Sequence, residues 1–358
     1  MAKSTSKDVA KLAGVSQSTV SMILNGKKDV SFSRETVDRV LNAAKQLNYK
    51  SSLRQGGEKQ NNGKAIAVFC ANLDNPYYTM LIQTISNLSE NYGYSMLVCD
   101  THRKYSVEAG YIKFMNNMIA GAIYTYLPQY TDLFQKISNR VPVVVLGDKD
   151  ETVTSDSVEL NSTKCGKLIA QYLLSLGHKK IAYISTPISD QMLARKRRVE
   201  GVLQEYEQHG FPNGVIVRAS TGNYNDRESP INEEYCAGYN LTQEILKEGD
   251  HGISAFVGLN DMVALGIMDA LADGKYRIPQ DYSVVGCDNN IFSRLASVSL
   301  TTVEHFVNQK GEDAFNMLIN KIQHKYTSKP EILPQKIVRL EYEPKLIVRG
   351  TTGSNKRK

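Results

Sequence analysis

From Ala65 onward the chain alternates short, continuously apolar runs with segments of helical periodicity, and this alternation restricts the possible folds more than any other feature. Such runs are typical of strands buried on both faces of a parallel sheet. The segments between them, such as 163–176 and 261–271, place apolar residues at helical spacing. Together they predict an α/β fold with doubly wound layers. The predicted strands lie within AIAVFCA at 65–71, YSMLVC at 94–99, AGAIYTY at 120–126, VPVVVLG at 141–147, KIAYIST at 180–186, ISAFVGL at 253–259 and YSVVGCD at 282–288.

The alternating region is nearly 290 residues long, which is more than one such domain usually holds. We therefore expect two similar halves with a cleft between them. Open α/β sheets bind ligands at the carboxyl ends of their strands, so the cleft is the expected binding site. Enzymes, cofactor-binding proteins and sugar-binding proteins all fit this description, and the fold class alone leaves the function open.

The sequence contains none of the common catalytic or cofactor motifs. No G-x-G-x-x-G follows a predicted strand, and G-x-x-x-x-G-K-[ST], G-x-S-x-G and H-E-x-x-H are all missing. The six histidines form no local metal-ligand pair, and the five cysteines contain no C-x-x-C. We therefore expect no catalytic residue, no cofactor and no metal, and we expect the cysteines to be buried free thiols.

The positive charge of the chain is concentrated at its N-terminus. Residues 1–64 hold 12 Lys and Arg against 5 Asp and Glu, whereas residues 65–358 hold 31 against 32. A small basic module attached to a nearly neutral body favours a polyanion-binding head on a domain with another task. A solubilising basic tail is the alternative interpretation of the charge alone.

The basic module has the pattern of a helix-turn-helix. Residues 7–24 place apolar side chains at helical spacing on either side of Gly14, which predicts two short helices capped by Ser6 and Ser16. A third helix is predicted to begin at Ser33, and three helices can enclose one small core. The second helix exposes a polar face suited to base edges in a DNA groove. A helical bundle without DNA-binding function is the alternative.

These helices contain DVAKLAGVSQSTVS at 8–21, LNG at 24–26, VS at 30–31 and LNY at 47–49. This long motif closely resembles the headpiece of the LacI/GalR (lactose repressor) family of transcriptional regulators. The resemblance implies that the second helix enters the major groove and that dimers bind a nearly palindromic operator. It places Gln17, Ser18 and Met22 at base-reading positions, with Ser16, Thr19, Ser21 and Asn25 nearer the phosphates.

Two features depart from the family pattern. Met22 replaces a common Arg and cannot make a bidentate contact with guanine, so the operator is expected to differ at that base pair. The family's hinge helix carries a leucine that wedges into the minor groove, but here residues 51–64 include Gly56 and Gly57, with Glu58 near the wedge position. We expect a flexible tether with weak or absent intercalation, unless Leu53 serves in a shifted register.

The resemblance continues to about Arg349 and includes periplasmic-type sugar-binding domains. In the family, the Arg of R-x-x-G, the Asn of N-D and the Asp of G-x-D reach into the cleft. These correspond to Arg198, Asn260 and Asp288, which could together bind vicinal hydroxyls. Considered separately, Arg198 could belong to a solvated helix face, Asn260 could be a helix cap and Asp288 could be a turn residue. The matching segments are NPYY at 75–78, LGHKKIA at 176–182, RVEG at 198–201, NDMVALG at 260–266, VVGCD at 284–288 and LTTV at 300–303.

Three further residues are candidates for the cleft by the same resemblance. Tyr224 stands where relatives carry an aromatic residue that stacks on a sugar ring, and Tyr77 and Thr125 belong to the other half. Gly147 occupies a position where the family usually has Asp, so the ligand is expected to be smaller or to be held by the neighbouring Asp148. A faint similarity to the effector domain of the arabinose repressor, at 94–97, 300–305 and 343–349, favours a pentose within a broader expectation of a sugar.

The sequence thus predicts a DNA-binding domain at 1–50, a Gly-rich linker at 51–64, a two-lobed effector and dimerisation domain at 65–349 and a basic tail at 350–358. We expect a non-enzymatic repressor of carbohydrate-use genes that binds double-stranded operator DNA as a homodimer and responds to a sugar or sugar phosphate. The alternative is a solute-binding or protein-responsive module with a weakened headpiece. No apolar run suits a secretory signal or a membrane span, so we expect a cytoplasmic protein.

Overall fold

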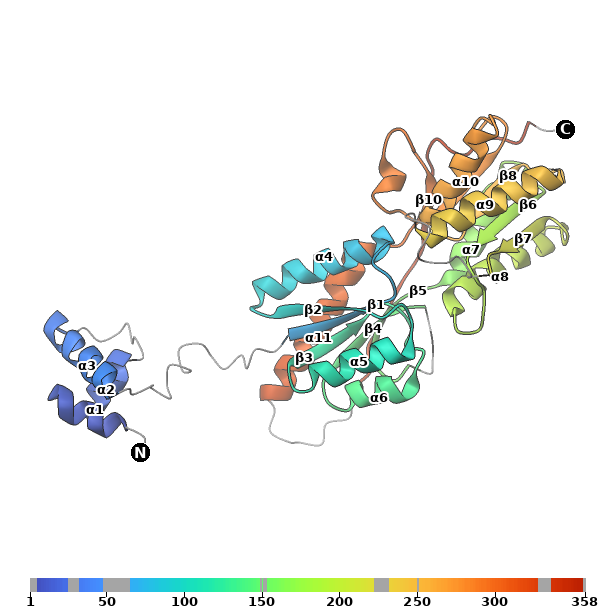
Figure 1. Cartoon of the computed structure of the whole chain (residues 1–358). Helices are drawn as coiled ribbons and strands as arrows, with labels where there is room; N and C mark the ends of the chain where they lie inside the picture. Colours follow the sequence, from blue (N-terminus) through green and yellow to red (C-terminus); the bar gives the residue numbers. More distant parts are fainter. Residues whose placement is uncertain are drawn as a thin grey trace. The chain divides into compact units, whose positions relative to one another are not determined.

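The computed structural model describes residues 5–24, 32–47, 65–148, 150, 153–221, 232–249, 251–327 and 336–356. The chain divides into two compact units, residues 1–64 and 65–358, and each is described by itself (Figure 1). Among the helices in these ranges, none is both long enough and apolar enough to cross a membrane.

The N-terminal unit has three helices around one small apolar core, as the sequence predicts. The helices pack pairwise because each turns an apolar stripe toward the other two. They are α1 (Ser6–Ala13), α2 (Gln17–Leu24) and α3 (Arg34–Gln46), and their buried apolar residues are Val9, Ala10, Ala13, Val20, Val40, Ala43 and Ala44.

The helix ends in this unit follow the local sequence, with one correction. Gly14 ends α1 in the left-handed conformation at a φ of 65°, and the Ser16 hydroxyl accepts a hydrogen bond from the backbone N of Thr19 at 3.1 Å. Ser6, the predicted first cap, lies inside α1. Thr5 takes that position because the Asp8 carboxylate accepts hydrogen bonds from both the backbone N and the hydroxyl of Thr5.

The second unit confirms the predicted α/β class and consists of two lobes. In the first lobe a six-stranded parallel sheet has the order β11-β5-β4-β3-β1-β2. Helices α4 and α11 cover one face of this sheet, and α5 and α6 cover the other (Figure 1). The elements are β1 (Ala65–Cys70), α4 (Pro76–Asn91), β2 (Ser95–Asp100), α5 (Tyr105–Met115), β3 (Ile119–Tyr124), α6 (Thr131–Ser138), β4 (Val143–Gly147), β5 (Asp156–Leu160), α11 (Val307–Thr327) and β11 (Arg339–Tyr342).

The second lobe repeats this plan. Its sheet has the order β12-β10-β9-β8-β6-β7, in which β12 runs antiparallel to β10 and the other pairs are parallel. Helices α7 and α8 cover one face, and α9 and α10 cover the other. The elements are α7 (Ser162–Ser175), β6 (Ile181–Ser185), α8 (Leu193–Gln208), β7 (Val215–Ala219), α9 (Glu233–Glu248), β8 (Ala255–Gly258), α10 (Asp261–Asp273), β9 (Ser283–Asp288), η1 (Phe292–Arg294), β10 (Thr301–Glu304) and β12 (Lys345–Ile347).

The chain passes between the lobes three times. It crosses from β5 to α7, returns from β10 to α11, and crosses again from β11 to β12. Each lobe therefore contains segments that are far apart in sequence, and residues near the three crossings lie between the lobes.

The seven predicted strands are present, but the sequence analysis missed others, of which β5 is instructive. Its sequence DSVEL contains buried Asp156 and Glu159. Lys321 lies 2.8 Å from the Asp156 carboxylate, and Arg339 lies 3.6 Å from that of Glu159. Because these partners come from α11 and β11, local apolarity could not identify the strand. The strands β7, β10, β11 and β12 were also not predicted.

The predicted basic tail at 350–358 is a second correction. Thr351 is buried, and its hydroxyl donates to the carbonyl of Val284 in β9 at 2.7 Å. The carbonyl of Gly353 lies 2.9 Å from Nε2 of His178, and the side chain of Asn355 donates to the carbonyl of Gly177. Residues up to Asn355 therefore belong to the second lobe, because their hydrogen bonds attach them to β9 and to the turn before β6.

Candidate functional site

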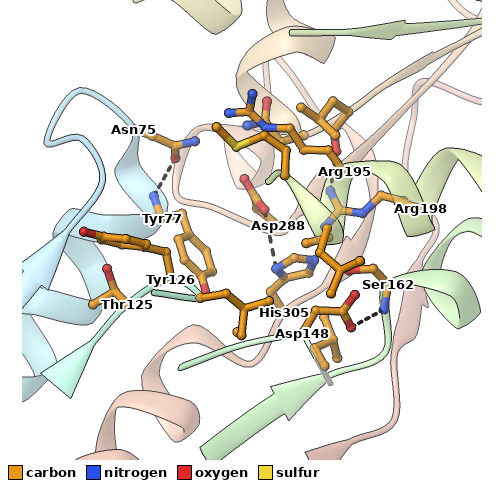
Figure 2. Close-up of a pocket in the computed structure, with 18 of the residues that line it drawn as sticks. Asn75, Tyr77, Thr125, Tyr126, Asp148, Ser162, Arg195, Arg198, Asp288 and His305 are labelled. Atoms are coloured by element: carbon orange, nitrogen blue, oxygen red, sulfur yellow. Dashed lines mark hydrogen bonds and ion pairs between the residues drawn. The ribbon is translucent and has the colours of Figure 1, made fainter. Parts of the chain in front are cut away.

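A pocket of about 150 Å³ lies between the two lobes, at the carboxyl ends of their strands (Figure 2). Thr125 follows β3, Asp148 follows β4 and His305 follows β10, and each lines the pocket. Of the six residues predicted to contact an effector, the structure brings five together here: Arg198, Asn260, Asp288, Tyr77 and Thr125. Tyr224 lies outside the described residues.

Arg198 is a buried cation on the wall of the pocket. It extends from α8 and is only 6% exposed. This burial excludes the alternative that Arg198 belongs to a solvated helix face. Its Nη1 donates a hydrogen bond to the carbonyl of Leu259. Its Nε is also buried and has no hydrogen-bond partner in the part of the chain that the structure describes. An unsatisfied donor in this position favours binding of a ligand oxygen.

The position of Arg198 depends on close packing between two helices. A Cβ atom added to Gly166 in α7 would lie 2.0 Å from the carbonyl O of Arg198, and one added to Gly201 in α8 would lie 2.2 Å from the carbonyl O of Thr163. Only glycine at both positions allows the two backbones to come this close. The sequence analysis recognised Gly201 as part of a motif but gave no role to Gly166.

Asp288 is the buried carboxyl group of the pocket. Its Oδ1 lies 3.5 Å from Nδ1 of His305, and its Oδ2 is buried without a hydrogen-bond partner among the described residues. Burial raises the pKa of Asp288 well above its ordinary value and lowers the pKa of His305 well below its own. A hydroxyl that donates to Oδ2 would satisfy this carboxylate.

Three predicted residues are already engaged by the protein. The Oδ1 of Asn260 accepts a hydrogen bond from the N of Val263 and caps α10, so the group that Asn260 can offer a ligand is its Nδ2 amide. Thr125 donates its hydroxyl to the carbonyl of Phe69 at 3.0 Å. The hydroxyl of Tyr77 accepts from Nζ of Lys310 at 3.2 Å.

Asp148 and Gly147 both line the pocket. Gly147 stands where the family usually has Asp, and the sequence analysis offered the neighbouring Asp148 as the carboxylate that could hold the ligand instead. Its Oδ1 accepts a hydrogen bond from the N of Ser162, and its Oδ2 lies 3.4 Å from Nη1 of Arg197. The carboxylate thus joins the end of β4 to the start of α7.

Sequence reasoning missed residues that join the lobes across the pocket. The side chain of Asn75 donates to the Glu234 carboxylate at 2.7 Å, and Arg195 lies 3.8 Å from the same carboxylate. Asn75 belongs to the first lobe, whereas Glu234 and Arg195 belong to the second. Because the two partners are 159 positions apart, no local pattern could identify this contact. Arg103, Tyr126, His305 and Lys310 also line the pocket and were not predicted.

The predicted DNA-contacting residues lie on and next to α2. Ser16, Gln17 and Ser18 are exposed, whereas Thr19, Ser21 and Met22 are partly buried. The amide Nε2 of Gln17 donates to the hydroxyl of Ser6 at 2.8 Å. Asn25 and the linker at 51–64 lie outside the described residues. The exposed polar side chains at the start of α2 can reach base edges without any change in the small core.

The chain matches two family models. Residues 5–52 match the lacI family of bacterial regulatory proteins, and residues 170–352 match the periplasmic binding protein-like domain. Similar curated proteins are named HTH-type transcriptional repressor PurR. One from Haemophilus influenzae Rd is 30% identical over 98% of this chain and 99% of its own length, and one from Mannheimia succiniciproducens is 28% identical over 96% and 97%.

Solved structures with 22–23% identity show the same fold. A lacI-family regulator from Enterococcus faecium with bound ribose has a TM-score of 0.68, at 22% identity, and covers 82% of this chain and 100% of its own. The Lac repressor bound to ONPG has a TM-score of 0.70, at 23% identity, and covers 98% and 100%. The helix-turn-helix, the two-lobed domain and these similarities agree, and the chain belongs to the lacI family of bacterial transcriptional regulators, as a DNA-binding protein with an effector domain and not as an enzyme.

Proposed function

We propose that this chain is a sequence-specific transcriptional repressor of carbohydrate-use genes whose affinity for operator DNA is set by a sugar or sugar phosphate in the pocket. One observation carries this proposal. Arg198 Nε and Asp288 Oδ2 are a donor and an acceptor that line the same pocket, are buried, and have no partner among the described residues. Leaving them unsatisfied costs free energy, and a ligand that carries several hydroxyls can satisfy both.

The rest of the pocket supports a small polyhydroxy ligand. Arg198, Asp288 and the Nδ2 of Asn260 offer directed hydrogen bonds, and Tyr77 and Tyr126 offer aromatic surface for the apolar side of a sugar ring. The pocket volume of about 150 Å³ suits a small ligand. Structures of similar proteins hold ribose, D-xylulofuranose and ONPG, and these ligands favour the same ligand class here.

The DNA-binding half of the proposal rests on the N-terminal unit. We assign base reading to Gln17, Ser18 and Met22, and phosphate contacts to Ser16, Thr19, Ser21 and Asn25. One headpiece can read only a half-site, so useful specificity requires two, and the repressor is proposed to act in the cytoplasm as a homodimer. A ligand controls operator affinity only if it binds the DNA-competent and DNA-incompetent arrangements unequally.

The Gly-rich linker favours a second candidate, a solute-binding or protein-responsive module with a weakened headpiece. Gly56, Gly57 and Glu58 oppose a hinge helix that inserts into the minor groove. The salt dependence of DNA binding separates the two candidates, because a working headpiece releases counterions and loses affinity steeply as salt rises.

The test of the proposed function is selection of binding sites from a randomised double-stranded DNA pool by the full-length protein. The selected DNA is then titrated in the presence of pentoses, hexoses, phosphosugars and planar nitrogen heterocycles. We expect a nearly palindromic consensus whose binding shifts with one sugar. A response to a heterocycle alone would overturn the sugar assignment, and enrichment of no sequence would favour the second candidate.

Replacing Gln17 by alanine is expected to lower the affinity for the selected operator by about 10-fold or more, because a base-reading amide contributes about 1–3 kcal/mol of discrimination. Affinity for unrelated DNA should change little, since that affinity comes from phosphate contacts. Fluorescence anisotropy with both DNAs measures the two effects. Gln46→Ala is the matched control, an exposed glutamine at the end of α3. Equal losses on both DNAs would remove Gln17 from base reading.

Replacing Glu234 by alanine is expected to weaken binding of the responding sugar by about 10-fold, because it removes the charge-assisted hydrogen bond between Asn75 and Glu234 that joins the lobes. Isothermal titration calorimetry measures this loss. Glu233→Ala is the control, since Glu233 is the adjacent glutamate in α9 and is not a lining residue of the pocket. Unchanged affinity in Glu234→Ala would show that this contact does not support the ligand-bound arrangement.

A further inference from the structure

A cluster of three side chains with metal-binding atoms lies next to the pocket. Cys165, Cys287 and His305 are buried, and their ligand atoms all lie within 4.8 Å of one another. The Sγ of Cys287 is 3.2 Å from Nε2 of His305. His305 lines the pocket, whereas the two cysteines are not lining residues. The proposed function makes no use of these two thiols.

We propose that Cys165, Cys287 and His305 bind a zinc ion beside the effector pocket. Two thiolates and one imidazole are a donor set that selects zinc among the common divalent cations, with a fourth position left for water. Zinc–sulfur and zinc–nitrogen bonds of about 2.0–2.3 Å place the ligand atoms of a tetrahedral site less than about 4 Å apart. The observed cluster already approaches this spacing, so small side-chain movements complete the site.

The neighbourhood of His305 provides independent support. Its Nδ1 lies 3.5 Å from the Asp288 carboxylate, while its Nε2 faces Cys287. In metal sites, a carboxylate that accepts the Nδ1 proton orients the ring and leaves Nε2 free to bind the ion. Asp288 is therefore assigned as a positioning residue of the zinc site as well as a residue of the effector pocket.

An ion can reach the cluster from the effector pocket. His305 is one of the three residues of the cluster and also forms part of the pocket wall.

The place of this cluster in the fold gives the ion a structural consequence. Cys165 lies in the first turn of α7, just after the chain crosses from β5 to the second lobe. His305 directly follows β10, where the chain returns to the first lobe. An ion bound by both residues would join two of the three segments that connect the lobes, and its occupancy would bias how the lobes close.

The test uses the full-length protein, reduced and freed of metal by a chelator, and titrates it with Co²⁺ as a spectroscopic probe. We expect one Co²⁺ per chain, with thiolate-to-cobalt charge-transfer absorption and tetrahedral d–d bands that disappear when one equivalent of Zn²⁺ is added. A wild-type protein without the charge-transfer absorption would overturn the proposal. Sugar and operator binding of the metal-free protein are measured separately, so failure here is distinguishable from failure of the proposed function.

Variants locate the ion. Cys165→Ser, Cys287→Ser and His305→Ala should abolish the charge-transfer absorption or weaken it strongly, and Asp288→Asn should lower zinc affinity by about 10- to 100-fold. Cys236→Ser is the matched control, because Cys236 lies in α9 outside the cluster and should leave the titration unchanged. Retained binding in both cysteine cluster variants would overturn the assignment. If those variants do not fold, X-ray absorption spectroscopy on the zinc-loaded wild-type protein tests the site instead. We expect two sulfur ligands on the zinc ion, and any other number would contradict the site.

Discussion

Replacement of Arg198 by alanine is expected to reduce effector affinity by about 100-fold, corresponding to about 2.8 kcal/mol, and to abolish the response of the operator complex to the effector. Arg198 offers charge-assisted hydrogen bonds from a buried position in the pocket, and its truncation removes a positive charge that lowers the pKa of Asp288 in the same pocket. Operator affinity without effector should stay within about twofold, because Arg198 belongs to the effector domain and contacts no DNA in the proposed arrangement.

Two measurements check this result. Calorimetry with the responding sugar reports the loss of effector affinity, and anisotropy with operator DNA reports the loss of response. Lys196→Ala is the matched control, since Lys196 lies two residues earlier in α8 and forms a 2.6 Å ion pair with Asp190 at the surface. If Arg198→Ala bound the sugar as tightly as the wild type, Arg198 would not belong to the effector site.

The second large effect is expected from Gly166→Ala, a change of one methyl group. The new Cβ would lie 2.0 Å from the carbonyl O of Arg198 and 2.9 Å from the N of Val202, both of which are backbone atoms of α8. Since a backbone atom cannot move without its helix, α7 and α8 must separate. We expect the free energy of unfolding to fall by about 3 kcal/mol, the melting temperature by roughly 6–10 °C, and effector affinity to fall as Arg198 moves with α8.

Gly110→Ala provides the control with the opposite sign. Gly110 lies in α5, and a Cβ added there meets no atom within 4 Å. Alanine should therefore stabilise the protein by about 0.5–1 kcal/mol, because glycine costs more backbone entropy in a helix interior. Thermal denaturation of both variants separates the effect of a helix contact from that of helix propensity. Similar melting temperatures for the two variants would contradict the close approach of α7 and α8.

The sequence alone predicted the elements that depend on local patterns. Gly14 and Ser16 set the ends of α1 and α2 through backbone conformation and hydrogen bonds within a few residues. The apolar runs predicted seven strands because a strand buried on both faces must be continuously apolar. The resemblance placed Arg198, Asn260 and Asp288 in one cleft, and the pocket contains all three.

Other features were decided only by the tertiary structure. The polar strand β5 is buried because Lys321 and Arg339, from distant parts of the chain, neutralise its carboxylates. Asn75 meets Glu234 because the chain passes between two sheets and brings segments of different lobes together. Cys165 lies beside Cys287 and His305 because α7 packs on the sheet of the second lobe that contains β9 and β10. A local sequence pattern predicts only the helix or strand to which each residue belongs. Burial in a low dielectric makes a partner necessary for a charged or polar side chain, but it does not specify which segment of the chain provides that partner. The order of the strands and the path of the chain between the lobes decide which segment this is.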